Sequence, residues 1–393
     1  MSQLEELSRH FRFSAEALKH LQSVYGSQLE PALEALRSPC RKYYFRANTI
    51  KARPRDVLEG FRKRGFNVEQ HPDIEEALYF NVEGPLEVPE FSRKVMADKF
   101  AAEAVLQGAN LYAAGVVNCS KLRLGDEVTM VDVMGHIVGS GVARMGEKEI
   151  LTFRRGLAVE VTHPRYRIPS LRETDEFNKG LVYEQSFPAI LTSRILEPKP
   201  SETILDVGAS PGGKTSHIAA LTENSCKIFS VDRNMRKIGV LKENLNRLGV
   251  TCASTLCTDA RYLDLEHSNL SFDKACIDVS CSSLGVRPKL FEQLPENRVS
   301  AVANYQKQFF KPVSKLLKSR GRLVYSTCTL TKEENEEVIR FASENCDLQV
   351  QEQKYFYGSP GFSDIFAEAT LTQRFHPHIH DTPGYFIAHL QKQ

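Results

Sequence analysis

The sequence predicts an α/β protein whose largest part is a doubly wound parallel sheet. Three observations indicate this fold class: strand-like and helix-like stretches alternate over residues 185–344, residues 203–215 read as a strand, a glycine-rich turn and a helix, and short strands with glycine turns fill residues 109–145. Alternating strands and helices are typical of parallel sheets covered on both faces. We expect a small N-terminal α/β unit over 1–85, an inserted β-barrel over 86–162 and a Rossmann-like domain over 163–393.

Composition and charge are those of a soluble globular protein. Hydrophobic residues make up 41% and charged residues 25% of the 393 residues, and the formal net charge is +2. No apolar run is long enough to span a membrane, and the polar N-terminus, MSQLEELSRHF, is not signal-like, so we expect a cytoplasmic protein. Nine cysteines without a C-x-x-C pair indicate reduced thiols, with neither a disulfide framework nor a metal site. Nothing in the sequence indicates an obligatory protein partner.

The N-terminal unit contains a concentration of positive charge. Apolar residues at helical spacing predict two or three helices over 2–37, and a strand, YYFRANTI, then precedes the helix ARPRDVLEGFRKRG and a second strand around FNVEQ. Residues 41–64, called the basic stretch below, contain nine Lys or Arg against Asp56 and Glu59. Such a run indicates either a nucleic-acid-binding face or an ordinary solvated helix surface.

The middle of the chain has the texture of a small barrel. After a proline-bearing linker, VEGPLEVPEF, we expect one helix first and then short strands whose turns lie at Gly115, Gly125, Gly135 and Gly139. A second linker, THPRYRIPS, leads to the alternating region. There we expect helices at 185–196, 214–221, 235–248, 297–317 and 332–344, and strands near 205, 229 and 255 and at 274–278 and 322–325.

Residues 203–215, TILDVGASPGGKT, form the motif around which the sheet domain is organised. Its glycines let the backbone approach a ligand closely at the start of a helix. The motif also fits G-x-x-x-x-G-K-T, the phosphate loop of ATPases, with KACID at 274–278 as the magnesium-binding strand. However, Pro211 removes one backbone N–H from the middle of this loop, and the next strand ends at Asp232, as in folds where a carboxylate binds ribose hydroxyls. Both features favour a nucleoside over a triphosphate.

Two cysteines stand directly after predicted strands of the sheet. Cys281 follows KACIDVS, and Cys328 follows RLVYST. Residues just beyond the carboxyl ends of parallel strands face the ligand crevice. Cys328 also precedes a helix predicted to start near Lys332, whose dipole and free N–H groups favour a thiolate. Inert buried thiols are the expectation for four other cysteines: Cys226, Cys252, Cys276 and Cys346.

The motifs together resemble the Fmu/Sun family of RNA cytosine-5 methyltransferases. The resemblance covers roughly residues 165–393 through DVGASPGGKT, Asp232, DAR, DVSCSSLG, RP, YSTCT and RFHPHIHDTPGYFIAHL. The barrel region resembles the RNA-binding PUA domain through LQGAN, YAAGV, LGDEV and a later G-x-G-x-A. This resemblance implies an enzyme that uses S-adenosylmethionine and belongs to the subgroup that methylates tRNA near its acceptor end.

The resemblance also implies roles for individual residues. The cysteine of the T-C-T motif, here Cys328, would add to carbon 6 of cytosine, and Cys281 would assist removal of the carbon 5 proton and product release. Asp278, supported by Lys214, would bind nitrogen 3 or the exocyclic amine. The cofactor would be bound by Asp232 at the ribose, Lys237 beside it, Asp259 towards the adenine, Asp278, and a loop around the amino-acid end made of Gly208, Ala209, Ser210, Pro211, Gly212, Gly213 and Lys214.

The chain departs from the family pattern in two motifs. The family has Cys-Ala-Ala-Pro where this chain has Gly-Ala-Ser-Pro at 208–211, and Ala-Pro-Cys-Ser-Gly where this chain has Val-Ser-Cys-Ser-Ser at 279–283. Ser280 in place of proline is expected to loosen the backbone before Cys281 and affect product release. Two alternatives stay open: a phosphate-loop ATPase, and an RNA-binding adaptor that has lost activity. The presence of Cys281, Cys328 and Asp278 favours an active enzyme.

Overall fold

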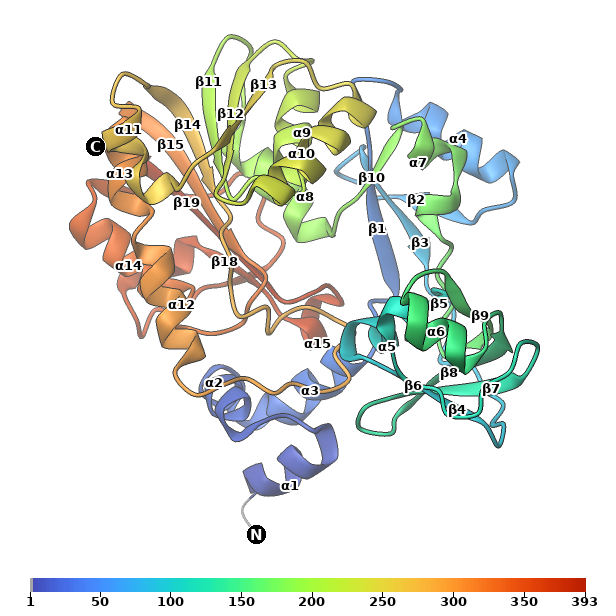
Figure 1. The fold of residues 1–393 in the computed structure, drawn as a ribbon. Helices are drawn as coiled ribbons and strands as arrows, with labels where there is room; N and C mark the ends of the chain where they lie inside the picture. The colour runs from blue at the N-terminus through green and yellow to red at the C-terminus, as the bar shows by residue number, and fades with distance from the viewer. Residues whose placement is uncertain (1–2) are drawn as a thin grey trace.

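The computed structural model describes residues 3–393 and arranges them around three sheets (Figure 1). A nine-stranded sheet forms the C-terminal domain, a four-stranded sheet belongs to the N-terminal unit, and a six-stranded sheet forms the barrel. The predicted fold class, a doubly wound Rossmann-like sheet with a small α/β unit and an inserted barrel, is confirmed.

The large sheet has the strand order β13-β12-β11-β14-β15-β19-β18-β17, with β16 beside β19. Strands β13 to β15 are parallel, but β19 is antiparallel to both β15 and β18, so the predicted parallel arrangement does not extend to the C-terminal edge. An apolar run such as YFIAHL predicts a buried strand without fixing its direction. The strands are β11 (Thr203–Val207), β12 (Lys227–Asp232), β13 (Ala253–Cys257), β14 (Phe272–Ile277), β15 (Leu317–Thr327), β16 (Leu348–Val350), β17 (Ser359–Pro360), β18 (Gln373–Phe375) and β19 (Tyr385–Lys392).

Helices cover both faces of this sheet because alternate strand residues point to opposite sides. Ile204 packs on the side of α8 and α9, whereas the next residue, Leu205, packs on the side of α13 and α14. The helices are α7 (Asp175–Asn178), α8 (Phe187–Leu196), α9 (Gly213–Leu221), α10 (Met235–Leu248), α11 (Leu263–Glu266), α12 (Arg298–Lys307), α13 (Phe310–Leu316), α14 (Glu336–Asn345) and α15 (Pro377–His380).

Two predicted helices of this domain differ from the observed ones. The helix expected at 297–317 is two helices, α12 and α13, because Pro312 lacks the N–H that would continue the hydrogen-bond ladder across the break. Leu317 already belongs to β15. The helix expected from Lys332 begins only at Glu336, and the residues before Glu336 form a loop.

The N-terminal helices support the large domain rather than the small sheet. They are α1 (Gln3–Phe11), α2 (Ala15–Tyr25) and α3 (Leu29–Arg37), as predicted. Their apolar faces share one buried cluster with Leu284, Leu294, Val299 and Leu330. Leu284 and Leu330 lie only a few residues from Cys281 and Cys328 in the chain. These helices therefore pack behind the two loops that follow β14 and β15 and contain Cys281 and Cys328, called the cysteine loops below.

The small sheet has the order β10-β1-β3-β2 and includes a strand from beyond the barrel. Its elements are β1 (Lys42–Ala47), α4 (Pro54–Lys63), β2 (Val68–Gln70), β3 (Ala77–Asn81) and β10 (Val182–Glu184). Strand β10 pairs with β1, although residue 182 lies in the region that we assigned to the third domain. The domain limits at 85 and 162 therefore stay predictions.

The barrel sheet has the order β5-β9-β8-β7-β4-β6. The expectation that a helix comes first is wrong, because the short strand β4 precedes α5 and pairs in parallel with β7. Leu290 and Phe291 of the large domain insert into the barrel core, and Lys99 Nζ lies 2.7 Å from Glu292 Oε2. The elements are β4 (Lys94–Ala97), α5 (Lys99–Leu106), β5 (Leu111–Tyr112), β6 (Val116–Asn118), β7 (Glu127–Asp132), β8 (Ile137–Ala143), α6 (Glu147–Phe153) and β9 (Leu157–Pro164).

Three general features of the described chain bear on function. Across residues 3–393, no helix has the length and apolar character needed to cross a bilayer. The same residues contain no group of three or more His, Cys, Asp or Glu side chains arranged to hold a metal ion. All nine cysteines are free thiols.

Candidate active site

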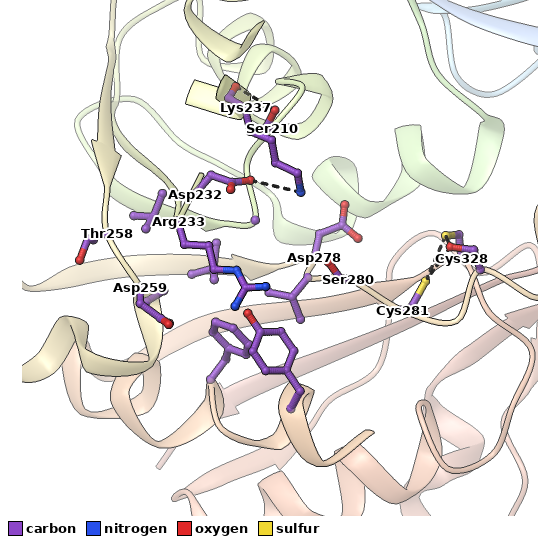
Figure 2. Close-up of a pocket in the computed structure, with 18 of the residues that line it drawn as sticks. Ser210, Asp232, Arg233, Lys237, Thr258, Asp259, Asp278, Ser280, Cys281 and Cys328 are labelled. Carbon is purple, nitrogen blue, oxygen red and sulfur yellow. Dashed lines mark hydrogen bonds and ion pairs between the residues drawn. The ribbon is translucent and has the colours of Figure 1, made fainter. Parts of the chain in front are cut away.

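One cavity of about 540 Å³ lies at the carboxyl ends of the parallel strands and contains both groups of predicted residues (Figure 2). Asp232 and Asp259 line one end, called the cofactor end below, and Cys281 and Cys328 line the other, called the thiol end. Asp278, just after β14, lies between the two ends. Ligands of doubly wound sheets bind in this crevice. The cavity therefore connects a nucleoside-type site with a pair of thiols.

Asp232 ends β12 at the cofactor end. Its Oδ1 accepts a hydrogen bond from the backbone N–H of Asn234 at 3.1 Å, and Lys237 Nζ lies 3.8 Å from its Oδ2. The hydroxyl of Ser210 donates to the backbone oxygen of Lys237 at 3.0 Å and so ties the glycine-rich loop to α10. This arrangement leaves a carboxylate facing the cavity, where it can accept hydrogen bonds from ribose hydroxyls.

Asp259 is held in place by Arg261, whose guanidinium donates to both carboxylate oxygens at 2.6–3.1 Å. These hydrogen bonds keep the pKa of Asp259 below its ordinary value. The guanidinium carbons of Arg261 and Arg233 lie 5.0 and 5.4 Å from the ring centroid of Tyr305. Arg233 and Tyr305 line the cavity but were not predicted, because nothing in the helical pattern of α12 shows that its ring meets the cations that follow β12 and β13 in the chain.

The glycine-rich loop approaches the strand end of β14 closely. Gly208 has φ +78°, and a Cβ at this position would lie 2.3 Å from the backbone oxygen of Asp278, so only glycine fits. Gly212 lines neither of the cavities beside the loop; with φ +109° it is the residue just before α9. A second cavity of about 240 Å³ shares Gly208, Ser210 and Asp278 with the first and is also lined by Ala209, Pro211, Gly213 and Lys214.

A buried carboxylate in the second cavity lacks a partner for one oxygen. Asp206 accepts a hydrogen bond from the Thr215 hydroxyl at 2.6 Å through Oδ2, whereas Oδ1 has no hydrogen-bond partner among the described residues. Burial raises the pKa of Asp206 to about 6. Unpaired buried acceptors are rare in folded proteins and indicate a missing donor. The loop thus fits a nucleoside that carries an amino-acid tail with N–H groups.

The same loop does not present the groups that an ATPase needs. Lys214 Nζ donates to Asp278 and lies 3.2 Å from the hydroxyl oxygen of Tyr385. The Thr215 hydroxyl is bound between Asp206 and Ser230. In phosphate loops these two side chains reach the phosphates and the magnesium ion. Because both are turned into the protein, the ATPase hypothesis is wrong.

The two predicted thiols are in direct contact. Cys281 Sγ lies 3.2 Å from Cys328 Sγ (Figure 2). The hydrogen bond with Cys281 lowers the pKa of Cys328, and the same contact raises the pKa of Cys281, so the pair favours a Cys328 thiolate that accepts a hydrogen bond from the S–H of Cys281. The helix dipole that we expected to favour the Cys328 thiolate does not lower this pKa. The helix was expected to start near Lys332, but α14 begins only at Glu336. The thiol predicted as the nucleophile is nevertheless the one favoured as thiolate.

A buried carboxylate holds the two cysteine loops together. Glu334 accepts hydrogen bonds from the backbone N–H of Ser282 at 2.8 Å and from the side chain of Gln306 at 3.1 Å. The hydroxyl oxygens of Ser282 and Thr329 lie 2.6 Å apart and bridge the loops directly. Gln306 also donates to the backbone oxygen of Ser280 at 3.2 Å. The segment before Cys281 is therefore anchored without the proline of the family pattern.

The half-buried Asp278 and the buried Lys214 form an ion pair beside the thiols. Lys214 is 7% exposed, and the charge of Asp278 helps to hold its pKa well above the ordinary value against the opposing effect of burial. Ser326 Oγ lies 3.4 Å from Asp278 Oδ1, and the Tyr385 hydroxyl donates to Ser326 at 3.3 Å. Ser326 and Tyr385 were not predicted as site residues. The motif that contains Tyr385 was recognised, but the antiparallel placement of β19 that brings it here was not.

Comparisons with known proteins agree with this arrangement. The family of 16S rRNA methyltransferases RsmB/F matches residues 193–391, and the PUA domain matches residues 93–164. The chain is 42% identical over 386 residues to the tRNA (cytosine(72)-C(5))-methyltransferase of Pyrococcus horikoshii, with 97% of each protein covered. It is 32% identical to the human tRNA (cytosine(72)-C(5))-methyltransferase NSUN6, covering 78% of this chain and 71% of that protein.

A solved structure gives the same result for the fold. The crystal structure of NSun6 from Pyrococcus horikoshii with SFG has a TM-score of 0.89 and 41% identity to this chain, covering 97% of this chain and 98% of that one. The predicted enzyme class, cofactor and RNA-binding domain are thereby confirmed. The chain belongs to the RsmB/F family and is an S-adenosylmethionine-dependent RNA cytosine-5 methyltransferase that carries a PUA domain.

Proposed function

We propose that this enzyme methylates carbon 5 of cytosine 72 of tRNA, near the acceptor end. Two relatives with high coverage, from Pyrococcus horikoshii and human, are named for this position. The PUA domain supports an RNA substrate of this kind. The target base must leave its stack to reach the thiols, so it should lie in a frayed or single-stranded end.

The proposed roles of the two cysteines are supported by their contact at 3.2 Å and by the lowered pKa of Cys328. The Cys328 thiolate forms a bond to carbon 6, and the electron pair of the carbon 5–carbon 6 double bond makes carbon 5 nucleophilic. When bound, S-adenosylmethionine supplies a methyl group on a positively charged sulfur. Carbon 5 would take that methyl group, and the cofactor sulfur would leave with the electrons of the broken carbon–sulfur bond as a neutral thioether. Cys281, whose own proton passes to solvent, then removes the carbon 5 proton as a thiolate; the electrons of that C–H bond form the carbon 5–carbon 6 double bond again, and Cys328 leaves as a thiolate.

The remaining predicted residues bind and orient. Asp278, fixed by Lys214, is placed to accept from the exocyclic amine or to bind nitrogen 3 while charge develops. Asp232 and Lys237 would hold the ribose, and Asp259 would lie towards the adenine. The loop Gly208, Ala209, Ser210, Pro211, Gly212, Gly213 and Lys214, together with Asp206, would surround the amino-acid end.

We further propose that the enzyme works in the cytoplasm. Two thiols 3.2 Å apart would be oxidised to a disulfide in an oxidising compartment, and the mechanism needs both reduced. Fractionation of the source cells with an antibody against the chain tests this proposal. Recovery in a membrane or secreted fraction would contradict it.

The thiol roles are tested by a denaturing gel of each purified variant with a tRNA transcript and S-adenosylmethionine. Cys281→Ala should form the carbon 6 adduct, methylate it and fail to release it, giving a retarded band, whereas Cys328→Ala should give no band. Cys257→Ala, at an exposed thiol outside the cavity, is the matched control and should release product normally. A retarded band from Cys328→Ala alone would reverse the two roles. Transcripts with cytosine or uracil at position 72 test the site, and methyl transfer to both would contradict it.

A further inference from the structure

A serine hydroxyl lies beside both thiols. Ser283 Oγ is 3.6 Å from Cys328 Sγ and 3.7 Å from Cys281 Sγ, and Ser283 lines the same cavity. Its backbone has φ +58°, in the left-handed region that favours glycine, and the pattern described above has glycine at this position. The chain therefore accepts an unfavourable backbone conformation at the residue whose side chain contacts both reactive sulfurs.

The two sulfurs need negative charge at different stages of the reaction. This reasoning rests on the proposed roles of Cys328 and Cys281. Before addition, the Cys328 thiolate is stabilised by the S–H of Cys281. Once Cys328 is bonded to carbon 6, its sulfur is a neutral thioether, and Cys281 must itself become the thiolate that removes the carbon 5 proton. The hydrogen bond between the two sulfurs no longer supplies a proton to the charged one.

Ser283 is the remaining hydrogen-bond donor at this second stage. Within residues 3–393, the hydrogen-bond partners of Cys281 Sγ are Cys328 and Ser283. The other groups that act on the pair are charged: Glu334 disfavours the Cys281 thiolate, Asp278 disfavours the Cys328 thiolate, and Lys214 favours the Cys328 thiolate. A hydroxyl donor that can turn to either sulfur offsets the two carboxylates.

We propose that Ser283 is a positioning residue that donates its hydroxyl hydrogen first to the Cys328 thiolate and then to the Cys281 thiolate. Because Oγ lies 3.6 and 3.7 Å from the two sulfurs, a rotation about the Cβ–Oγ bond directs the hydroxyl hydrogen to one sulfur or the other. The hydrogen bond with Ser283 lowers the pKa of each thiol, in agreement with this role. The hydroxyl thus links addition and release, which use different thiolates.

The first test measures each thiol separately in the free enzyme. Ser283→Ala is combined with Cys281→Ala or with Cys328→Ala, and the rate at which iodoacetamide alkylates the remaining active-site cysteine is followed by peptide mass spectrometry from about pH 6 to 10. Loss of a hydrogen bond to a charged sulfur should slow alkylation of both thiols roughly threefold to tenfold at about pH 7. The rates should converge at the upper end of the range, where each thiol is ionised without help. Unchanged rates at about pH 7 for either thiol would overturn the proposal.

Ser283→Gly separates the hydroxyl from the backbone. Glycine suits φ +58° and removes the same hydroxyl, so Ser283→Gly and Ser283→Ala should slow alkylation of the remaining active-site cysteine to the same extent. Slow alkylation in Ser283→Ala with a normal rate in Ser283→Gly would assign the effect to backbone strain and overturn the proposal. Because alkylation uses no RNA, its outcome is independent of which RNA or base is the substrate.

The second test follows the reaction with RNA. In the Cys281→Ala background, Ser283→Ala should form the covalent adduct roughly threefold to tenfold more slowly at about pH 7. With Cys281 present, Ser283→Ala should accumulate an adduct that the unchanged enzyme does not. An adduct that forms and decays at the unchanged rates would overturn the role of Ser283, while absence of any adduct in Cys281→Ala itself would contradict the proposed thiol mechanism.

Discussion

The two cysteine loops and the basic stretch differ in how their functional side chains are arranged: the loops bring theirs together, and the basic stretch does not. The loops after β14 and β15 bring Cys281 and Cys328 from 47 positions apart in the chain to a sulfur contact of 3.2 Å. Glu334 and Ser282 hold those loops against each other. The result is one concentrated site at the edge of the sheet.

The basic stretch scatters its charges instead. Arg46 is fully buried and donates to Gln185 and Ser216. Arg53, the residue just before α4, and Arg55 in its first turn form ion pairs with acidic side chains of that helix. Carboxyl ends of parallel strands all meet at one edge of the sheet, whereas a helix directs successive side chains around its whole circumference. Functional residues that follow parallel strands therefore come together at one site, whereas charged residues in a row along a helix do not.

The largest expected effect comes from breaking the convergence of the cysteine loops. Glu334→Ala would leave the backbone N–H of Ser282 and the hydroxyl of Thr331 without this acceptor and would leave Gln306 only its second acceptor, the backbone oxygen of Ser280. We expect the free energy of unfolding to fall by on the order of 3–5 kcal/mol, because each unsatisfied buried donor costs about 1–3 kcal/mol. Urea unfolding measures this loss.

A conservative variant serves as the control for Glu334. Glu334→Gln keeps one carbonyl oxygen and should lose less than half as much stability. The contact between the thiols should loosen in Glu334→Ala, so that alkylation of Cys328 shifts to higher pH as the hydrogen bond from Cys281 weakens. A stable Glu334→Ala protein with an unchanged alkylation profile would show that the sheet alone sets the loop positions.

The second effect is confined to the cofactor end. Asp232→Ala should weaken binding of S-adenosylhomocysteine roughly tenfold to a hundredfold, because hydrogen bonds to a charged group contribute about 1.5–3 kcal/mol. Calorimetry measures the affinity. The adduct trapped by Cys281→Ala should still form in the double variant when the cofactor is saturating, because Asp232 lies at the opposite end of the cavity. Unchanged affinity would remove Asp232 from the cofactor site.

The sheet and its ligand crevice could be predicted because their signals are local. Strand, turn and helix patterns located β11, α9 and the strand ends that carry Asp232, Cys281 and Cys328. Strand direction is a different matter. The antiparallel course of β19 and the pairing of β10 with β1 depend on contacts between distant segments, which no local pattern contains.

The supporting residues of the site could not be predicted for the same reason. Glu334, Tyr305 and Tyr385 act at the site through neighbours from other elements, and each stands in an ordinary helix, loop or strand context. Ser283 could have been noticed, since it replaces a glycine of the family pattern. Its contact with both sulfurs depends on the relative position of the two loops, which no local pattern contains.

The smallest effect is expected from replacing cations of the basic stretch. This prediction tests whether these cations act singly or together on RNA. Arg62 donates to the backbone oxygen of Val68 at 3.1 Å, and Arg64 forms an ion pair with Glu176, so among these neighbours Lys63 is the exposed cation best able to meet a phosphate. Replacing Lys63 by Ala should flatten the dependence of log affinity for tRNA on log salt by about one, and replacing all three by Ala should add little further.

The slope of log affinity for tRNA against log salt concentration shows how many of these cations contact phosphates. If all three cations contacted phosphates, the triple variant would flatten the slope by about three, and the basic stretch would be a built RNA-binding face like the PUA domain. A control that replaces Arg53 and Arg55, both paired within α4, should leave the slope unchanged. Affinity for S-adenosylhomocysteine should be the same in every variant, because these cations lie outside the cofactor cavity. A slope change near three would show that the contacts of Arg62 with Val68 and of Arg64 with Glu176 do not prevent these cations from acting together with Lys63 on RNA.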